Sequence, residues 1–201
     1  MRCLFIDTSS FFINIAITYN NTIIYHKYTK VERDMSSLII PIIKEGFDSV
    51  SFDIKNLDKI FIVNGPGSFT GVRVGVTVAK TIAWSLNIPL IPISSLEVIA
   101  STNSDKKYHV GLIDARRGNV FAGVYDKELN VIKEDRFINF NELDINDYYE
   151  LIGEGYKESN PDILKVINKH INDEDINPHV LKPNYLKLTE VEEKLNDKRN
   201  N

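Results

Sequence analysis

The segment of the sequence best suited to binding or chemistry is Asn64–Gly75, which reads Asn-Gly-Pro-Gly-Ser-Phe-Thr-Gly-Val-Arg-Val-Gly. We expect a strand before it and a helix after it, and the free N–H groups at the start of a helix bind anions. Ser68 or Thr70 can cap this helix, and Arg73 can add positive charge. The segment has neither the Lys-Ser/Thr of a P-loop nor the spacing of the dinucleotide-binding G-x-G-x-x-G motif. The sequence leaves open whether it is an anion site or only a tight turn with a helix cap.

Two carboxylates, Asp7 and Asp114, stand at the ends of short apolar runs. A bound Mg-nucleotide needs carboxylates near the metal and bare backbone beside the phosphates. A hydroxyl residue but no glycine follows Asp7, and bulky, positively charged residues occupy 115–117. We therefore expect weak or absent ATP binding by the isolated chain. The candidate residues for weak nucleotide or anion binding are Asp7, Thr8, Ser68, Arg73 and Asp114.

Histidine, cysteine and serine give little support for catalysis. The one cysteine, Cys3, excludes an internal disulfide and a cysteine-cluster zinc site, and favours a reducing, cytoplasmic setting. The four histidines include no pair three or four residues apart, the spacing that puts two ligands on one helix face. Glycines lie at −3, −1 and +3 from Ser68 and not two residues to each side, as a hydrolase nucleophile elbow requires. We predict no catalytic residue and no metal site in this chain.

Small residues recur every four positions along the helix expected after the glycine-rich segment. Glycine inside a helix costs about 1 kcal/mol relative to alanine, so the close approach of another element must offset it. The stripe either packs on this chain's own sheet or receives a helix of a partner protein. The candidate partner-interface residues are Gly71, Gly75, Ala79 and Ala83, with Leu38 and Ile42 from the preceding helix.

The elements that must position these residues alternate between strands and helices. Apolar and alternating runs predict strands at 2–7, 12–19, 22–28, 59–63 and 88–93. Helical spacing predicts helices at 37–50 and 69–86, and Ser94-Ser95-Leu96-Glu97 has the form of a capping box that opens a short helix. This order of elements indicates an α/β fold.

The opening of the chain is repeated once. Residues 6–16 and 113–123 both read Ile-Asp, then a turn, then an apolar strand. Chance similarity of two strand ends is the alternative to a true duplication. We expect a first lobe at 1–102, a smaller second lobe at 103–180, and a C-terminal segment at 181–201 that packs back on the first. The pattern weakens after residue 126, with helices expected at 162–172 and 189–198.

Composition and charge limit the function. The 201 residues are 43% hydrophobic and 26% charged, which excludes a disordered chain. No apolar run reaches the roughly 18 residues of a membrane span, and the start turns polar too early for a signal peptide. The net charge is −4; residues 1–125 hold 13 Lys and Arg against 10 Asp and Glu, and residues 126–201 hold 11 against 18. The sequence has no dense basic stripe, so if the chain acts on RNA we expect a partner protein to supply the RNA binding.

Four segments together resemble the bacterial TsaB (YeaZ) family. They occur in one order, at Ile6–Ser9, Gly65–Gly75, Ile113–Gly118 and Pro183–Lys187. The resemblance covers 1–125 well and then the last of these segments, whereas 126–180 carries no recognisable match. It implies two RNase H-like lobes of the actin/Hsp70/sugar-kinase type, with the second lobe reduced.

The resemblance also implies a function. TsaB-like proteins act with a paralogue, TsaD, and an ATPase, TsaE. Together they transfer threonylcarbamoyl from threonylcarbamoyl-adenylate to N6 of the adenosine beside the anticodon, in tRNAs that read codons beginning with A. TsaD-type proteins bind a metal through two histidines on the helix that corresponds here to Ser94–Ala100, which has none.

The resemblance therefore implies a non-catalytic scaffold that activates TsaD. ATP with Mg²⁺ and the TsaD-bound metal belong to the complex, and tRNA is met only indirectly. The helix faces 37–50 and 70–86 would dock TsaD, and a homodimer is expected in isolation, with no membrane contact. Two alternatives remain: an independent ATPase or kinase of the same fold, and a regulatory interaction protein with no role in tRNA.

Overall fold

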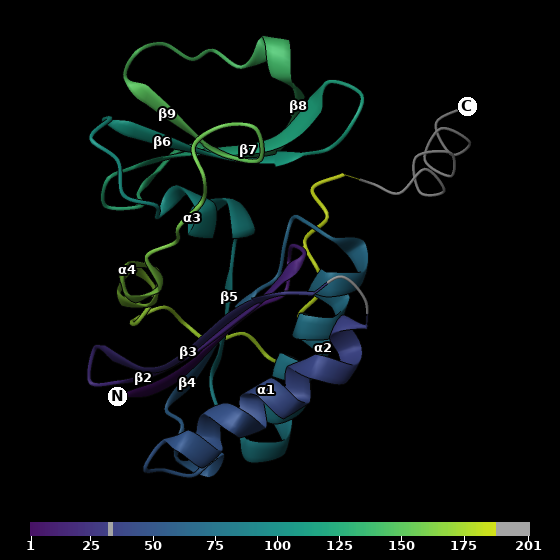
Figure 1. The fold of residues 1–201 in the computed structure, drawn as a ribbon, viewed down its shortest axis with the longest axis vertical. Coiled ribbons are helices and arrows are strands. Elements are labelled where there is room, and N and C mark those ends of the chain that lie inside the picture. The colour runs from purple at the N-terminus through teal and green to yellow at the C-terminus, as the bar shows by residue number, and fades with distance from the viewer. Residues whose placement is uncertain (32–33, 188–201) are drawn as a thin grey trace.

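The computed structural model describes residues 1–31 and 34–187, and its first part is a five-stranded sheet (Figure 1). The strand order is β3-β2-β1-β4-β5, with β1 antiparallel to β2 and parallel to β4. The first three strands form a meander, and the other two follow helices and run parallel to β1. The strands are β1 (Arg2–Asp7), β2 (Phe12–Tyr19), β3 (Thr22–Lys30), β4 (Lys59–Val63) and β5 (Leu90–Ile93).

Two helices lie side by side on one face of this sheet (Figure 1): α1 (Met35–Ser49) and α2 (Phe69–Leu86). A short 3₁₀ turn, η1 (Ile54–Asn56), leads into β4. Pro41 lies inside α1, which continues through it to Ser49. The apolar sides of both helices pack against β1, β2 and β4 and form a core with them. Fully buried members of this core include Leu4, Ile39 and Ile62. Among residues 1–31 and 34–187, no helix is both long and apolar enough to cross a membrane.

The second sheet repeats the topology of the first with one strand fewer. Its order is β8-β7-β6-β9, again a meander followed by a strand parallel to the first one. The strands are β6 (Tyr108–Asp114), β7 (Asn119–Asp126), β8 (Val131–Asn139) and β9 (Tyr149–Gly153), with η2 (Phe140–Glu142) after β8. The α/β class and the two-lobed fold with a reduced second lobe are confirmed. Strand β9 was not predicted, because a polar stretch surrounds its five residues.

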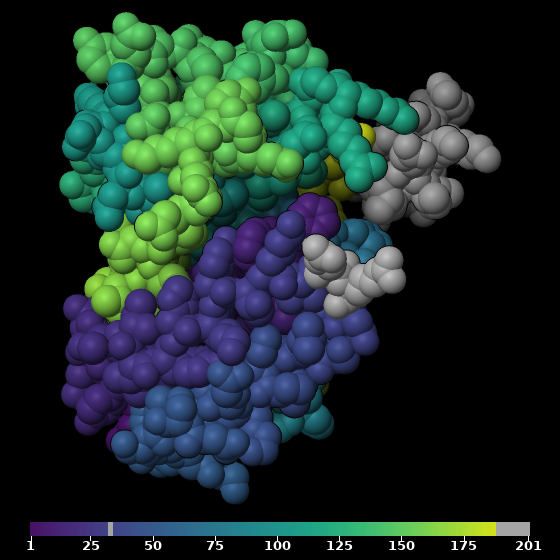
Figure 2. All heavy atoms as spheres, viewed as in Figure 1, coloured from purple at the N-terminus to yellow at the C-terminus, as the bar shows by residue number. Residues whose placement is uncertain are grey.

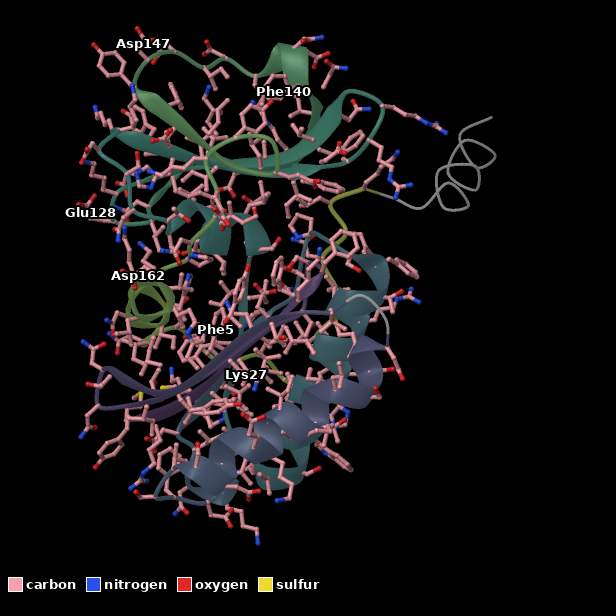
Figure 3. All side chains as sticks on the ribbon, viewed as in Figure 1. Phe5, Lys27, Glu128, Phe140, Asp147 and Asp162 are labelled. Carbon is pink, nitrogen blue, oxygen red and sulfur yellow. The ribbon has the colours of Figure 1, made fainter. Side chains whose placement is uncertain are left out.

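The sheets share a layer formed by α3 (Ser95–Ala100) and α4 (Ile163–Lys169). One buried cluster joins Phe5 of the first sheet, Leu96 of α3 and Ile167 of α4 with residues from β7. Figure 3 shows the labelled Phe5 on the α3 side of the first sheet and Asp162 at the start of α4. The boundary expected at residue 103 therefore lies between the two sheets in the sequence, but one buried cluster contains residues from both sides of it.

The chain then returns to the first sheet. The Ile176 N–H donates to the Leu90 carbonyl at 2.9 Å, and the Asn184 N–H donates to the Asn64 carbonyl at 2.7 Å. Leu181 is 3% exposed within the core of the first sheet. Residues 181–185 of the expected return segment thus pack on the first lobe. The rest of it, including the helix predicted at 189–198, lies outside the described residues.

Candidate functional site

The glycine-rich loop before α2 is filled by the protein's own backbone. A Cβ atom at Gly67 would collide with the carbonyl oxygen of Ser9, and one at Gly65 would collide with that of Asn184. Gly65 also has a φ of 113°, which side chains disfavour. These glycines therefore permit close packing of two other segments of the chain.

The polar groups at the start of α2 are likewise used within the chain. The Ser68 side chain accepts a hydrogen bond from the Gly71 N–H at 3.2 Å, which confirms it as the helix cap. The Ser68 N–H donates to the Ser9 carbonyl at 2.7 Å. The hydroxyl of Thr8, fully buried, donates to the Gly71 carbonyl at 2.7 Å. Of the two interpretations left open for this segment, the geometry favours the tight turn with a cap.

The two strand-end carboxylates each hold a turn in place. Asp7 accepts hydrogen bonds from the N–H and hydroxyl of Ser9, at 2.8 and 2.7 Å. Burial raises the pKa of the Asp7 carboxyl above its ordinary value, and the bonds from Ser9 work against that shift. Asp114 is exposed and accepts from the Arg116 N–H at 2.8 Å. Both carboxylates thus order the backbone after the first strand of their sheets.

The five candidate nucleotide- or anion-binding residues do not form one site. Thr8 and Ser68 meet around the start of α2, next to the turn that Asp7 holds. Arg73 points away from it and donates from Nε to the Tyr185 hydroxyl at 2.6 Å. Within the described residues, no hydrogen bond or ion pair joins Arg73 or Asp114 to the other three.

The small-residue stripe of α2 faces this chain's own sheet, so its prediction as a partner interface was wrong. Ala79 and Ala83 are 0% and 1% exposed, and Gly71 is buried against Thr8. A Cβ atom at Gly75 would collide with the Thr8 hydroxyl and lie 3.4 Å from Cδ1 of Ile62. The stripe lets α2 approach β1 and β4 closely.

The two candidate interface residues of α1 differ in exposure. Ile42 is buried in the same core, so it too was wrongly predicted to contact a partner. Leu38 is 40% exposed and stays a candidate. Leu38 lies on the side of α1 that faces β3, because it stands two turns before Glu45, which pairs with Lys27. The other surface that α1 and α2 offer, here called the outer helical face, consists of the exposed residues Ile40, Thr77, Thr81 and Trp84. Figure 2 shows α1 on the surface of the lower part of the molecule. Sequence periodicity missed this face because glycine and alanine marked the opposite side of α2.

Comparison with known families decides which proteins this fold belongs with. A family model described as TsaD, tRNA N6-adenosine threonylcarbamoyltransferase, matches residues 20–191. The chain belongs to the TsaD family. The match begins after β2 and takes in the remaining strands of both sheets and the layer between them.

Individual relatives of the TsaD family agree with the resemblance to TsaB (YeaZ), which is confirmed. The tRNA threonylcarbamoyladenosine biosynthesis protein TsaB of Bacillus subtilis is 38% identical over 138 residues. The aligned region covers 67% of this chain and 59% of the Bacillus subtilis protein. The protein of the same name from Buchnera aphidicola subsp. Schizaphis graminum is 27% identical over 197 residues, covering 90% of this chain and 93% of that one. YeaZ from Pseudomonas aeruginosa has the same fold, with a TM-score of 0.80 at 20% identity over 92% of this chain and 99% of that chain.

Helix α3 contains no histidine and is joined to the end of α4 by a polar contact. Ser94 caps the helix by accepting from the Leu96 N–H at 3.1 Å, but Glu97 does not complete the predicted capping box. Its carboxylate lies 2.7 Å from Nε2 of His170, whose Nδ1 lies 2.6 Å from Asp173. In residues 1–31 and 34–187, no group of three or more His, Cys, Asp or Glu side chains is placed to hold a metal ion.

The cluster of Glu97, His170 and Asp173 is a polar feature that the sequence did not predict, since Glu97 and His170 lie 73 residues apart. Burial acts to lower the pKa of His170, but the hydrogen bonds to Glu97 and Asp173 outweigh it and raise that pKa. Protonated His170 donates from both ring nitrogens to carboxylates. The cluster thereby ties the end of α4 to α3.

Proposed function

We propose that the chain is a non-catalytic subunit of a tRNA threonylcarbamoyl transferase, in which a TsaD-type partner carries the chemistry. It activates that partner for transfer of threonylcarbamoyl from threonylcarbamoyl-adenylate to N6 of the adenosine beside the anticodon, in tRNAs that read codons beginning with A. The match to the TsaD family over residues 20–191 carries the proposal. The filled glycine-rich loop supports the non-catalytic part, because glycines that admit backbone leave no cradle for phosphate.

The partner surface in this proposal is the outer helical face. Ile40 and Trp84 are 52% and 64% exposed, and large apolar side chains gathered on two neighbouring helices are typical of protein interfaces. A TsaD-type subunit docks there in the complex, and a second copy of the chain occupies the face in isolation. The ATPase TsaE joins the assembly, which works in the cytoplasm and supplies ATP, Mg²⁺ and the partner's metal.

The docking surface is tested with exposed positions, which a folded chain tolerates. Thr77→Arg and Ile40→Glu place charge on the outer helical face and are expected to abolish co-purification with the TsaD-type partner. Ile132→Glu, at a 44% exposed position of β8, is the matched control and should co-purify normally. Circular dichroism checks that all three variants fold. Normal capture of both face variants would contradict the interface.

The alternative of an independent ATPase or kinase is tested by calorimetry on the isolated chain. The two turns after Asp7 and Asp114 are closed by the chain's own hydrogen bonds, so no micromolar ATP binding is expected. A titration that gives micromolar affinity would support the ATPase instead.

The role in tRNA is tested in the cell that encodes the chain. Depletion is expected to lower the threonylcarbamoyl-adenosine content of the tRNAs that read codons beginning with A. Re-expression of the Ile132→Glu variant should restore the content, and the Thr77→Arg variant should not. Normal content after depletion would favour a regulatory protein with no role in tRNA.

A further inference from the structure

A row of cations and aromatic rings crosses from the first sheet to the second. On α2, the guanidinium carbon of Arg73 lies 3.8 Å from the centre of the Phe69 ring. Phe69 in turn stacks on Tyr185, with ring centres 5.3 Å apart, and the Tyr185 hydroxyl accepts from Arg73. These three side chains brace one another, so the guanidinium is held in place at the surface.

The row continues onto the second sheet through the end of the described chain. Leu186 packs against the same core cluster as Ile113 and Phe121, a residue pair close to the turn of the β6–β7 hairpin. Nζ of the exposed Lys187 lies 4.8 Å from the centre of the Phe137 ring. The segment after Pro183 therefore links the Arg73 side of α2 to this hairpin.

The hairpin tip adds two arginines in an unfavourable backbone conformation. Arg116 and Arg117 have φ angles of 66° and 57°, in the left-handed region that residues with a side chain seldom adopt. Hydrogen bonds hold this conformation, since Asp114 accepts from the Arg116 N–H and Asn119 donates to both arginine carbonyls. Figure 2 shows the hairpin projecting beside the segment that ends the described chain.

The four cations of this row, Arg73, Arg116, Arg117 and Lys187, are here called the cationic patch. Among the described residues, none of them forms an ion pair with a carboxylate. The chain as a whole has a net charge of −4, so the gathering of positive charge is local. Asn or Gly would adopt this conformation more readily than arginine. The presence of two arginines at a strained turn therefore indicates that the arginine charge is used in binding.

We infer that the cationic patch binds the phosphate backbone of RNA, and this inference rests on the proposed function, in which tRNA is the substrate of the complex. Arginine and lysine interleaved with aromatic rings are typical of RNA-binding surfaces, where they contact phosphates and stack with bases. The patch spans both sheets, so its ligand must be extended and regularly charged. The chain then adds phosphate contacts to a tRNA that the partner holds.

A protein partner fits the patch less well. Protein interfaces have an apolar centre from which charged residues are depleted. Here a guanidinium lies over the Phe69 ring and an ammonium group lies over the half-buried Phe137 ring, so charged groups form the surface above both rings. An acidic protein is accordingly the competing ligand, and the experiment separates the two.

The test uses the assembled complex with the double variant Arg116→Asn, Arg117→Asn. Asparagine tolerates the left-handed conformation, so the hairpin is preserved while two charges are removed. Lys127→Gln is the matched control, because strand pairing places the 127–130 turn at the opposite end of β7. Steady-state transfer is measured against tRNA concentration at several salt concentrations, with co-purification and kcat as separate readouts.

The double variant is expected to raise the KM for tRNA about tenfold with kcat unchanged, and to lower the slope of log affinity against log salt by about two. The control should match the unmodified complex. An unchanged KM and salt slope would overturn the inference, and so would a loss of co-purification, which would assign the patch to a protein. If the other subunits transfer threonylcarbamoyl to tRNA equally well without this chain, the proposed function is contradicted instead.

Discussion

The carbonyl oxygen and hydroxyl of Thr8 occupy the space where side chains at Gly71 and Gly75 would lie. At the scale of residues, this explains why glycine stands inside a helix despite its cost. Glycine here allows α2 to contact the residue that directly follows β1. The same logic applies to Gly67, whose missing side chain admits the Ser9 carbonyl.

Gly71→Ala is therefore expected to destabilise the protein although alanine is the better helix former. The new Cβ atom meets a backbone carbonyl that cannot rotate away, so we expect a loss of about 1–3 kcal/mol in the free energy of unfolding. Ser85→Ala, at an exposed position of the same helix, is the control and should change it by less than about 0.5 kcal/mol. Urea unfolding measures both. A Gly71→Ala variant as stable as the parent would show that α2 has room above Thr8.

His170 gives a pH dependence of stability. Its raised pKa in the folded chain means that the bonds to Glu97 and Asp173 stabilise the fold fully below about pH 6.5, the ordinary pKa of histidine. This stabilisation is lost as the pH rises through the folded-state pKa. His170→Gln should thus cost most at low pH, about 1–3 kcal/mol, and progressively less as the pH rises. Parallel stability curves for the two proteins between pH 5 and pH 9 would refute this account.

At the scale of elements, the segment 176–187 acts as an extra layer on the first sheet. It pairs with Leu90 through Ile176, buries Leu181, and closes on the glycine-rich loop through Asn184. The connection ties the end of the described chain to its first half. It also positions Tyr185 beside α2.

Two neighbouring residues of this segment provide a matched pair. Leu181 is 3% exposed and Val180 is 59% exposed. Leu181→Ala should lower the free energy of unfolding by about 2–5 kcal/mol, because it opens a cavity in the core. Val180→Ala should have an effect below about 0.5 kcal/mol. Equal midpoints for the two variants in thermal unfolding would mean that the segment is not packed as described.

Local pattern predicted the elements well and their exposed faces poorly. The alternation of Ile13, Ile15 and Ile17 predicted β2, and Ser68 was one of two candidate caps, because both signals are confined to a few residues. The side of α2 that faces the sheet could not be derived, since a small-residue stripe fits a strand or a helix equally well. The contact between Glu97 and His170 joins distant parts of the sequence and left no local signal.

At the scale of the whole molecule, the two sheets carry one topology twice and share the core between them. The turns after β1 and β6 are held by hydrogen bonds to Asp7 and Asp114. The outer helical face and the cationic patch are the two surfaces that we propose for binding.

The central claim is that this chain activates a partner without chemistry of its own. The most direct measurement is threonylcarbamoyl transfer to tRNA in vitro by the TsaD-type partner and TsaE, with and without the chain. We predict that transfer requires the chain and fails with Thr77→Arg, while Asp7→Asn, at the closed turn, supports it normally if folded. Full transfer by the partners alone, or loss of transfer with a folded and assembled Asp7→Asn complex, would contradict the claim.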